Sequence, residues 1–120
     1  EDLNRPLEYY DLVVTGDLGF IGKDIMTDLL VGAGIEKSII SSHYNDCGTM
    51  LFSREQDVHS GGSGCGCSAA VFCGHVLKAM EGGGLKRVLL MSTGALLSTI
   101  SSFQGESIPG ITHAVSLEVE

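Results

Sequence analysis

The sequence has no tryptophan, two prolines and only seven basic residues among its 120 positions. Fifteen acidic residues give a formal net charge of −8, and the lysines and arginines are scattered along the chain. A phosphate-backbone footprint needs clustered basic side chains, so we expect no nucleic-acid partner. No apolar run approaches the ~20 residues of a membrane-spanning helix. The polar, acidic first ten residues do not have the pattern of a signal peptide.

Hydrophobic residues make up 43% of the chain and charged residues 18%, which is typical of a folded domain. The length suffices for one domain with a modest core. There are four cysteines, of which Cys65 and Cys67 are too close in sequence to bridge each other comfortably. We therefore expect reduced, mostly buried thiols rather than a disulfide framework. The chain begins without methionine, which suggests a processed product or a piece of a longer protein.

Apolar patterning predicts an α/β fold with a mixed sheet in the order βαβαββ. The expected strands cover 11–15, 38–42, 87–92 and 111–119, and the expected helices cover 17–30 and 67–80. Glycines at 32, 34 and 82–84 are expected to end the two helices. The segment 43–60 is expected to be irregular, with a hairpin piece near 50–52, and 93–110 to be a loop. The residues expected on the inner face of the first helix are Leu18, Ile21, Ile25 and Leu29.

The second predicted helix, CSAAVFCGHVLKAM, carries small residues on nearly every face of its first two turns. A surface helix normally has charge on one side, so this one is expected to be buried all round. A single sheet with two helices cannot easily surround it. The sequence therefore predicts a missing second layer, supplied by another half of a longer chain or by a partner subunit.

The stretch VVTGDLGFIGKDI matches the glycine pattern of a dinucleotide-binding turn, and Gly64–Ala69 fits G-x-G-x-x-A. A nicotinamide site also needs an acidic residue about 20 positions later for the ribose hydroxyls. The corresponding strand tips are Ser41-Ser42-His43 and Met91-Ser92-Thr93, which have no acid. Tight turns and close helix–strand packing are the favoured reading of these glycines, and we expect no cofactor.

Five segments in order, VTGDLGFIGKDI, YNDCG, QDVHSGGSGCGCSA, TGALLS and GESIPGITHAV, resemble the C-terminal half of the stage V sporulation protein AD family. These are spore proteins of Bacillus-like bacteria with a thiolase-like fold, and the resemblance covers nearly the whole chain. It implies that residues 1–120 form one C-terminal thiolase-like domain, a βαβαββ half. It also implies an N-terminal thiolase-like half as a partner, with the second helix buried centrally between the two.

The resemblance also bears on catalysis. Condensing enzymes of that superfamily place a His and an Asn in a turn that falls on Gly16–Gly19, and a second Asn at Gly66. Glycine has no side chain that could move a proton or polarise a thioester. The resemblance thus implies a protein that binds dipicolinic acid or its calcium chelate without transforming it. Its expected setting is sporulation and germination, peripheral to the inner spore membrane, with other stage V sporulation membrane proteins. The alternatives are an acyl-CoA condensing enzyme and a structural scaffold of a membrane complex.

The ligand site is expected where three segments meet at the carboxyl ends of the strands. They are the loop after the first strand, the glycine-rich turn and the loop after the third strand. Backbone N–H groups at the start of the second helix would favour a carboxylate there. Asp17 is expected to be the N-cap of the first helix, a polar group of this pocket that could act through calcium, or both. The candidate ligand-binding residues are Gly16, Asp17, Cys65, Gly66, Cys67, Thr93 and Gly94.

Six further residues could suggest a metal site, but they lack zinc-ligand spacing, and we expect no metal site. They are His43, Asp46, Cys47, His59, Cys65 and Cys67. His43 and His59 are instead expected to flank the pocket mouth, His75 to be a core histidine, and His113 to be structural. Because the central helix lacks its cover, the isolated chain is expected to self-associate, so a homo-oligomer is a further expected partner.

Overall fold

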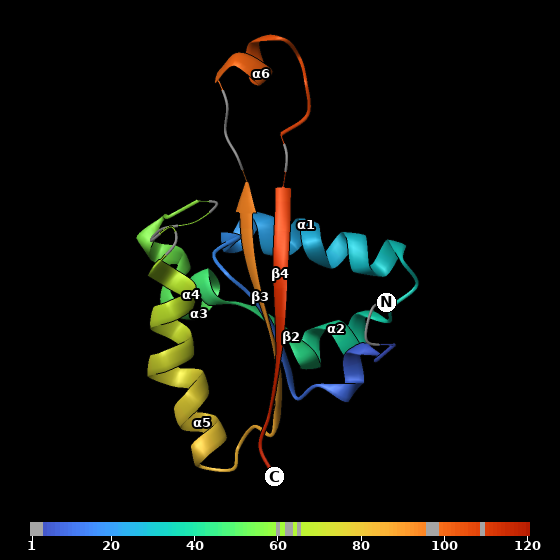
Figure 1. Ribbon diagram of the computed structural model, residues 1–120, viewed down its shortest axis with the longest axis vertical. Helices are drawn as coiled ribbons and strands as arrows, with labels where there is room; N and C mark the ends of the chain where they lie inside the picture. Colours follow the sequence, from blue (N-terminus) through green and yellow to red (C-terminus); the bar gives the residue numbers. More distant parts are fainter. Residues whose placement is uncertain (1–3, 60, 62–63, 65, 96–98, 109) are drawn as a thin grey trace.

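The computed structural model describes residues 4–59, 61, 64, 66–95, 99–108 and 110–120 (Figure 1). Its centre is a four-stranded mixed sheet in the order β2-β1-β3-β4. Helices cover both faces: α1 and α2 lie on one side, and α3, α4 and α5 on the other (Figure 1). The predicted α/β class with a mixed sheet is confirmed.

Strand β1 (Leu12–Thr15) is central and runs parallel to both of its neighbours, β2 (Tyr44–Asp46) and β3 (Arg87–Ala95). Strand β4 (Gly110–Glu118) is antiparallel to β3. In register, Thr15 lies beside Asp46 on one side and Met91 on the other. The carboxyl ends of β1 and β2 therefore meet at one end of the sheet.

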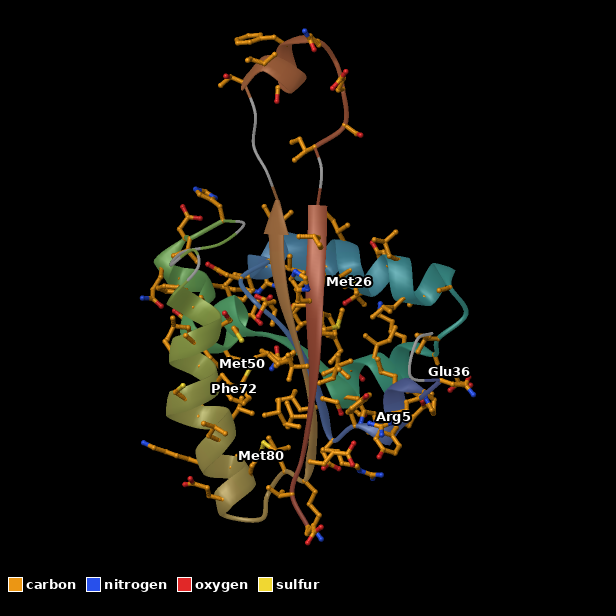
Figure 2. All side chains as sticks on the ribbon, viewed as in Figure 1. Arg5, Met26, Glu36, Met50, Phe72 and Met80 are labelled. Atoms are coloured by element: carbon orange, nitrogen blue, oxygen red, sulfur yellow. The ribbon has the colours of Figure 1, made fainter. Side chains whose placement is uncertain are left out.

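Successive side chains of a strand point to opposite faces of the sheet, so the strands contribute to two separate hydrophobic cores, one on each face. Val14 and Val88 are buried with α4 and α5, whereas Val13 packs on the opposite face with Ile40 and Tyr44. Figure 2 shows the same division, with Phe72 and Met80 on the α4–α5 side and Met26 beneath α1.

Helix α1 (Gly19–Gly32) ends where the glycine pattern predicts. Gly34 has a φ of 93°, its N–H donates to Val31 O, and the N–H of Ile35 donates to Leu30 O. These two bonds form a Schellman motif, which needs a left-handed residue that glycine adopts without strain.

The predicted inner face of α1 is wrong for three of its four residues. Ile21, Ile25 and Leu29 are 53–64% exposed, and Met26 and Leu30 pack on the core instead. Both sets have helical spacing, so periodicity alone could not choose between them.

The predicted strand at 38–42 is also wrong, because these residues belong to helix α2 (Lys37–His43). The hydroxyls of Ser41 and Ser42 donate to Ser38 O, which fits a helical turn. The strand follows instead at Tyr44–Asp46, and a search for apolar residues does not find it because its side chains are polar. The hairpin piece expected near 50–52 is helix α3 (Cys47–Leu51).

The second predicted helix is confirmed as one continuous run: α4 (Gly66–Val71), a π-helical turn η3 (Phe72–Val76) and α5 (Leu77–Glu81). It buries one face, with Cys67, Val71, Val76 and Met80 against the sheet. The opposite face is exposed in this chain, so the helix is covered on one side only. That face carries Ala69, Ala70, Cys73, Gly74 and His75.

Strands β3 and β4 extend past the end of β1 as a two-stranded ribbon that carries helix α6 (Thr99–Phe103) at its far end (Figure 1). The segment 93–110 was expected to be a loop, but residues 93–95 belong to β3, and Gly94 pairs with Ile111. Ile100 and Phe103 of α6 are largely exposed.

Two short 3-10 turns complete the described chain: η1 (Leu7–Tyr9) before β1 and η2 (Arg54–Gln56) after α3.

Candidate functional site

The carboxylate of Asp46 organises the end of the sheet. It is fully buried and accepts hydrogen bonds from Thr15 Oγ1 at 2.7 Å and from the backbone N–H groups of Leu18 at 2.9 Å and Gly19 at 3.1 Å. It also accepts from Thr49 N at 3.3 Å. One negative charge thus lies at the amino ends of both α1 and α3, where helix dipoles favour it.

A second carboxylate, that of Asp17, lies beside the first. Its Oδ2 accepts a hydrogen bond from Gly64 N at 3.0 Å in the turn before α4. A methyl group placed on Gly48 would overlap Asp17 Oδ1 and lie 3.0 Å from Asp46 Oδ2. The two carboxylates therefore approach the same buried glycine, and only glycine fits between them.

Asp17 does not cap α1, because that helix has no side-chain cap on its own N-cap residue and Asp46 accepts its first N–H groups instead. The N-cap alternative for Asp17 is therefore wrong. Asp17 joins the β1–α1 turn to the turn before α4 and remains a polar group at the candidate site.

Two cysteine side chains lie beneath these carboxylates, in the core between the sheet and α4. Cys47 and Cys67 are both fully buried. Burial first, and then the nearby Cys67, Asp46 and Asp17, together raise the pKa of the Cys47 thiol to about 12. This thiol is neutral and packs as a small apolar group.

The structure brings several predicted site residues to one end of the sheet. Gly16 and Asp17 follow β1 directly, and Gly66 opens α4. Thr93 and Gly94 lie on β3 beyond its pairing with β1, in a strand rather than a loop. The side chain of Cys67 is in the core, and its backbone N–H donates to Gly64 O at 3.3 Å. Cys65 lies outside the described residues.

Open space adjoins two of these positions. A side-chain atom built on Gly66 or on Gly94 would meet nothing within 4 Å. Both glycines are exposed, so this open space lies at the surface, at the start of α4 and along the end of β3.

Two of the four histidines, His43 and His75, are placed differently from expectation. His43 Nδ1 lies 2.8 Å from Tyr10 O, before the start of β1, so it does not flank the candidate site. His59 lines a hollow of about 210 Å³ with Phe20 and Arg54, near the start of α1.

His75 is exposed on the uncovered helix face and is not a core residue. It lines a hollow of about 530 Å³ with Met50, Leu51, Ala70, Val71 and Gly74. His113 lies on β4 opposite Ser92 of β3, in a strand as expected.

Sequence reasoning missed the central role of Asp46. The usable local signal was the residue type, because aspartate is among the residues preferred at helix N-caps. Its bonds to the first turn of α1 come from 27 and 28 positions away and carry no local signal.

Among the described residues, no helix has both the length and the apolar character needed to cross a bilayer.

Comparisons with known proteins match the chain to one family. The family model of stage V sporulation protein AD matches residues 1–118. The stage V sporulation protein AD of Bacillus subtilis (strain 168) is 42% identical over 118 residues, which are 98% of this chain and 34% of that protein. The chain thus spans about a third of the length of this relative. It belongs to the stage V sporulation protein AD family, a family of sporulation proteins.

Proposed function

We propose that the protein containing this chain binds dipicolinic acid, as its calcium chelate, and helps to move it into and out of the spore without transforming it. It would act in sporulation and germination, peripheral to the inner spore membrane, with other stage V sporulation membrane proteins. The observation that carries the proposal is the family match over residues 1–118. The ligand and partners belong to the whole protein, of which this chain supplies one part.

The absence of catalysis is inferred from three glycines. Gly16, Gly19 and Gly66 occupy the positions at which the resemblance to condensing enzymes places a His and two Asn residues. None of the three can donate or accept a proton through a side chain. The nearby Asp46 carboxylate is already bonded to four donors, so it is a structural group rather than a free base.

The calcium chelate suits this end of the sheet better than the free dianion. The chain has a net charge of −8, and Asp17 and Asp46 both lie close to the candidate site. A dicarboxylate alone would be repelled by these charges, whereas its one-to-one calcium complex is neutral and brings a cation toward Asp17. Space beside Gly66 and Gly94 would take the flat aromatic ring.

Two assays on the full-length protein separate this function from its rivals. Calorimetry with dipicolinate should detect binding that strengthens when calcium is present, and acyl-CoA substrates should show no condensation or thiolysis. Clear turnover would establish the condensing-enzyme alternative. No binding of either dipicolinate form, with assembly into the membrane complex intact, would establish the scaffold alternative.

A further inference from the structure

A hollow of about 210 Å³ lies between α1 and α2, on the side of the sheet away from α4 and α5. Two lysines and two residues with aliphatic hydroxyls are among its lining residues, and none of the lining residues is acidic. Its lining residues are Lys23, Thr27, Lys37, Ile40, Ser41 and Tyr44. We propose that this hollow is a binding site for a phosphoryl group, distinct from the dipicolinate site.

The charge of the hollow is unusual for this chain. Only four lysines occur in the sequence, and two of them line this one space. In the part of the chain that the structure describes, neither forms an ion pair, whereas Arg5 pairs with Glu118. The acids next to lining residues in sequence, Asp24, Asp28 and Glu36, are all outside the lining, and Glu36 accepts a hydrogen bond from Ser38 Oγ. Two lysine charges that are not paired with an acidic side chain attract an anion that carries about two negative charges.

Lys23 is held in place rather than free in solvent. Its side chain is half-buried, and Nζ donates to Asn45 Oδ1 at 2.7 Å. The same oxygen accepts from Asp46 N at 2.9 Å and from Thr49 Oγ1 at 3.1 Å, which fixes Asn45. An ammonium has three N–H donors, so two remain for a ligand. Part of the entropy cost of ordering this lysine is therefore met before any anion binds.

The hydroxyls can join the lysines. Thr27 Oγ1 donates to Lys23 O at 2.9 Å and Ser41 Oγ to Ser38 O at 2.8 Å, both within their own helices. Such bonds back to the helix stabilise it little, so each hydroxyl can turn toward an anion at small cost. Buried Ile40 forms an apolar wall of the hollow.

The size and charge of the hollow indicate the ligand. It is smaller than the 300–1,000 Å³ typical of pockets for larger ligands, so it suits one small group. A phosphate monoester carries about −1.5 to −2 charges at pH 7 and three acceptor oxygens, which match two ammonium groups. Because the chain is acidic overall, free phosphate or a soluble phosphomonoester is favoured over the headgroup of an anionic bilayer.

The test is a titration of the full-length protein with inorganic phosphate, followed by ³¹P NMR and calorimetry. Wild-type protein should bind at millimolar concentrations, and Lys37→Met should weaken binding by about tenfold because an exposed charged donor is lost. Lys78→Met is the matched control, since Lys78 is exposed on α5 and does not line the hollow. Lys23→Met should act like Lys37→Met, and a thermal melt checks that each variant is folded.

A second arm distinguishes the source of the phosphoryl group. Flotation with phosphatidic acid vesicles against phosphatidylcholine vesicles should show no Lys37-dependent binding if the ligand is soluble. Vesicle binding that Lys37→Met abolishes would assign the same site to a lipid headgroup. The proposal is overturned if wild-type protein does not bind phosphate, or if Lys37→Met and Lys78→Met bind it equally. None of these outcomes depends on dipicolinate binding.

Discussion

The Thr15 hydroxyl donates a 2.7 Å hydrogen bond to the buried carboxylate of Asp46, and this bond joins the ends of two neighbouring parallel strands. The Tyr44 hydroxyl lies 3.1 Å from Thr15 Oγ1. Because the Thr15 proton is directed at Asp46, Tyr44 donates to Thr15, and the three side chains form one buried chain of hydrogen bonds. Burial raises the pKa of Tyr44, so its hydroxyl keeps its proton.

Asp46→Asn should destabilise the full-length protein by about 2–4 kcal/mol. Four groups donate hydrogen bonds to this carboxylate, and an amide nitrogen can accept from none of them. Urea unfolding followed by circular dichroism measures the loss. Asp57→Asn is the matched control, because Asp57 is exposed and its left-handed backbone suits asparagine. Equal stability of the two variants would contradict the role given to Asp46.

Cys47 should resist alkylation in the native full-length protein at pH 8. Its pKa of about 12 leaves the thiol protonated, and its side chain is fully buried. Iodoacetamide labelling with mass spectrometry should find Cys47 unmodified until denaturant is added. Labelling of Cys47 in the native protein at the rate of the unfolded chain would show that the thiol is accessible or ionised.

Cys73 tests whether a second layer covers the central helix. It is exposed on the small-residue face of the α4–α5 helix in this chain. We predict that Cys73 is alkylated rapidly in residues 1–120 alone and is protected in the full-length protein. The isolated chain should also self-associate in sedimentation and bind a hydrophobic dye, because its apolar faces lack a cover. A monomer that binds no dye, or equal labelling of Cys73 in both proteins, would contradict the expected layer.

Asp11 should make stability depend on pH at the acid end. Its Oδ2 accepts from Arg87 N at 2.8 Å and Lys86 N at 2.7 Å, and these bonds, that of Arg87 first, hold its pKa below the ordinary 3.8. A lowered folded-state pKa adds stability above the ordinary pKa, which is lost as pH falls through the folded value. The urea midpoints of wild type and Asp11→Asn should therefore differ at pH 7 and converge below pH 3.8.

Asp24→Asn is the control for that experiment, since Asp24 is exposed on α1 and should change the midpoint little at either pH. A gap between wild type and Asp11→Asn that stays constant down to acid pH would show that the charge of Asp11 contributes nothing.

The sequence predicted the parts of the fold that depend on strong local signals. Apolar β1 and β3 were found, and so was the helix that ends at Gly82–Gly84, where Gly83 has a φ of 74°. Strand β2 was missed because its buried residues, Tyr44 and Asp46, are polar and satisfied by hydrogen bonds to a distant segment. The strand was predicted at 38–42 because Ile39 and Ile40 form an apolar pair there, but these residues belong to α2.

The candidate site was predicted in part. Gly16, Asp17 and Gly66 lie in turns at one end of the sheet as predicted, because turns between strands and helices carry glycine signals, and their role in binding stays a prediction. The burial of Cys67 was predicted with that of the other thiols, but the exposure of Cys73 and His75 was not, because only the packing on the sheet decides which helix face is covered. The role of Asp46 could not be predicted because its carboxylate contacts the start of α1, which is 27 positions away in the sequence.

The measurement that tests the proposed function most directly is calcium-dipicolinate binding by the full-length Gly66→Leu variant. Gly66 has open space around it, so leucine should fill the site without unfolding the protein, and calorimetry should find binding weakened by at least about tenfold. Gly32→Leu, at another glycine with open space at the far end of α1, should bind like wild type. A Gly66→Leu protein that melts normally and binds the chelate with unchanged affinity would contradict a ligand site at the start of α4.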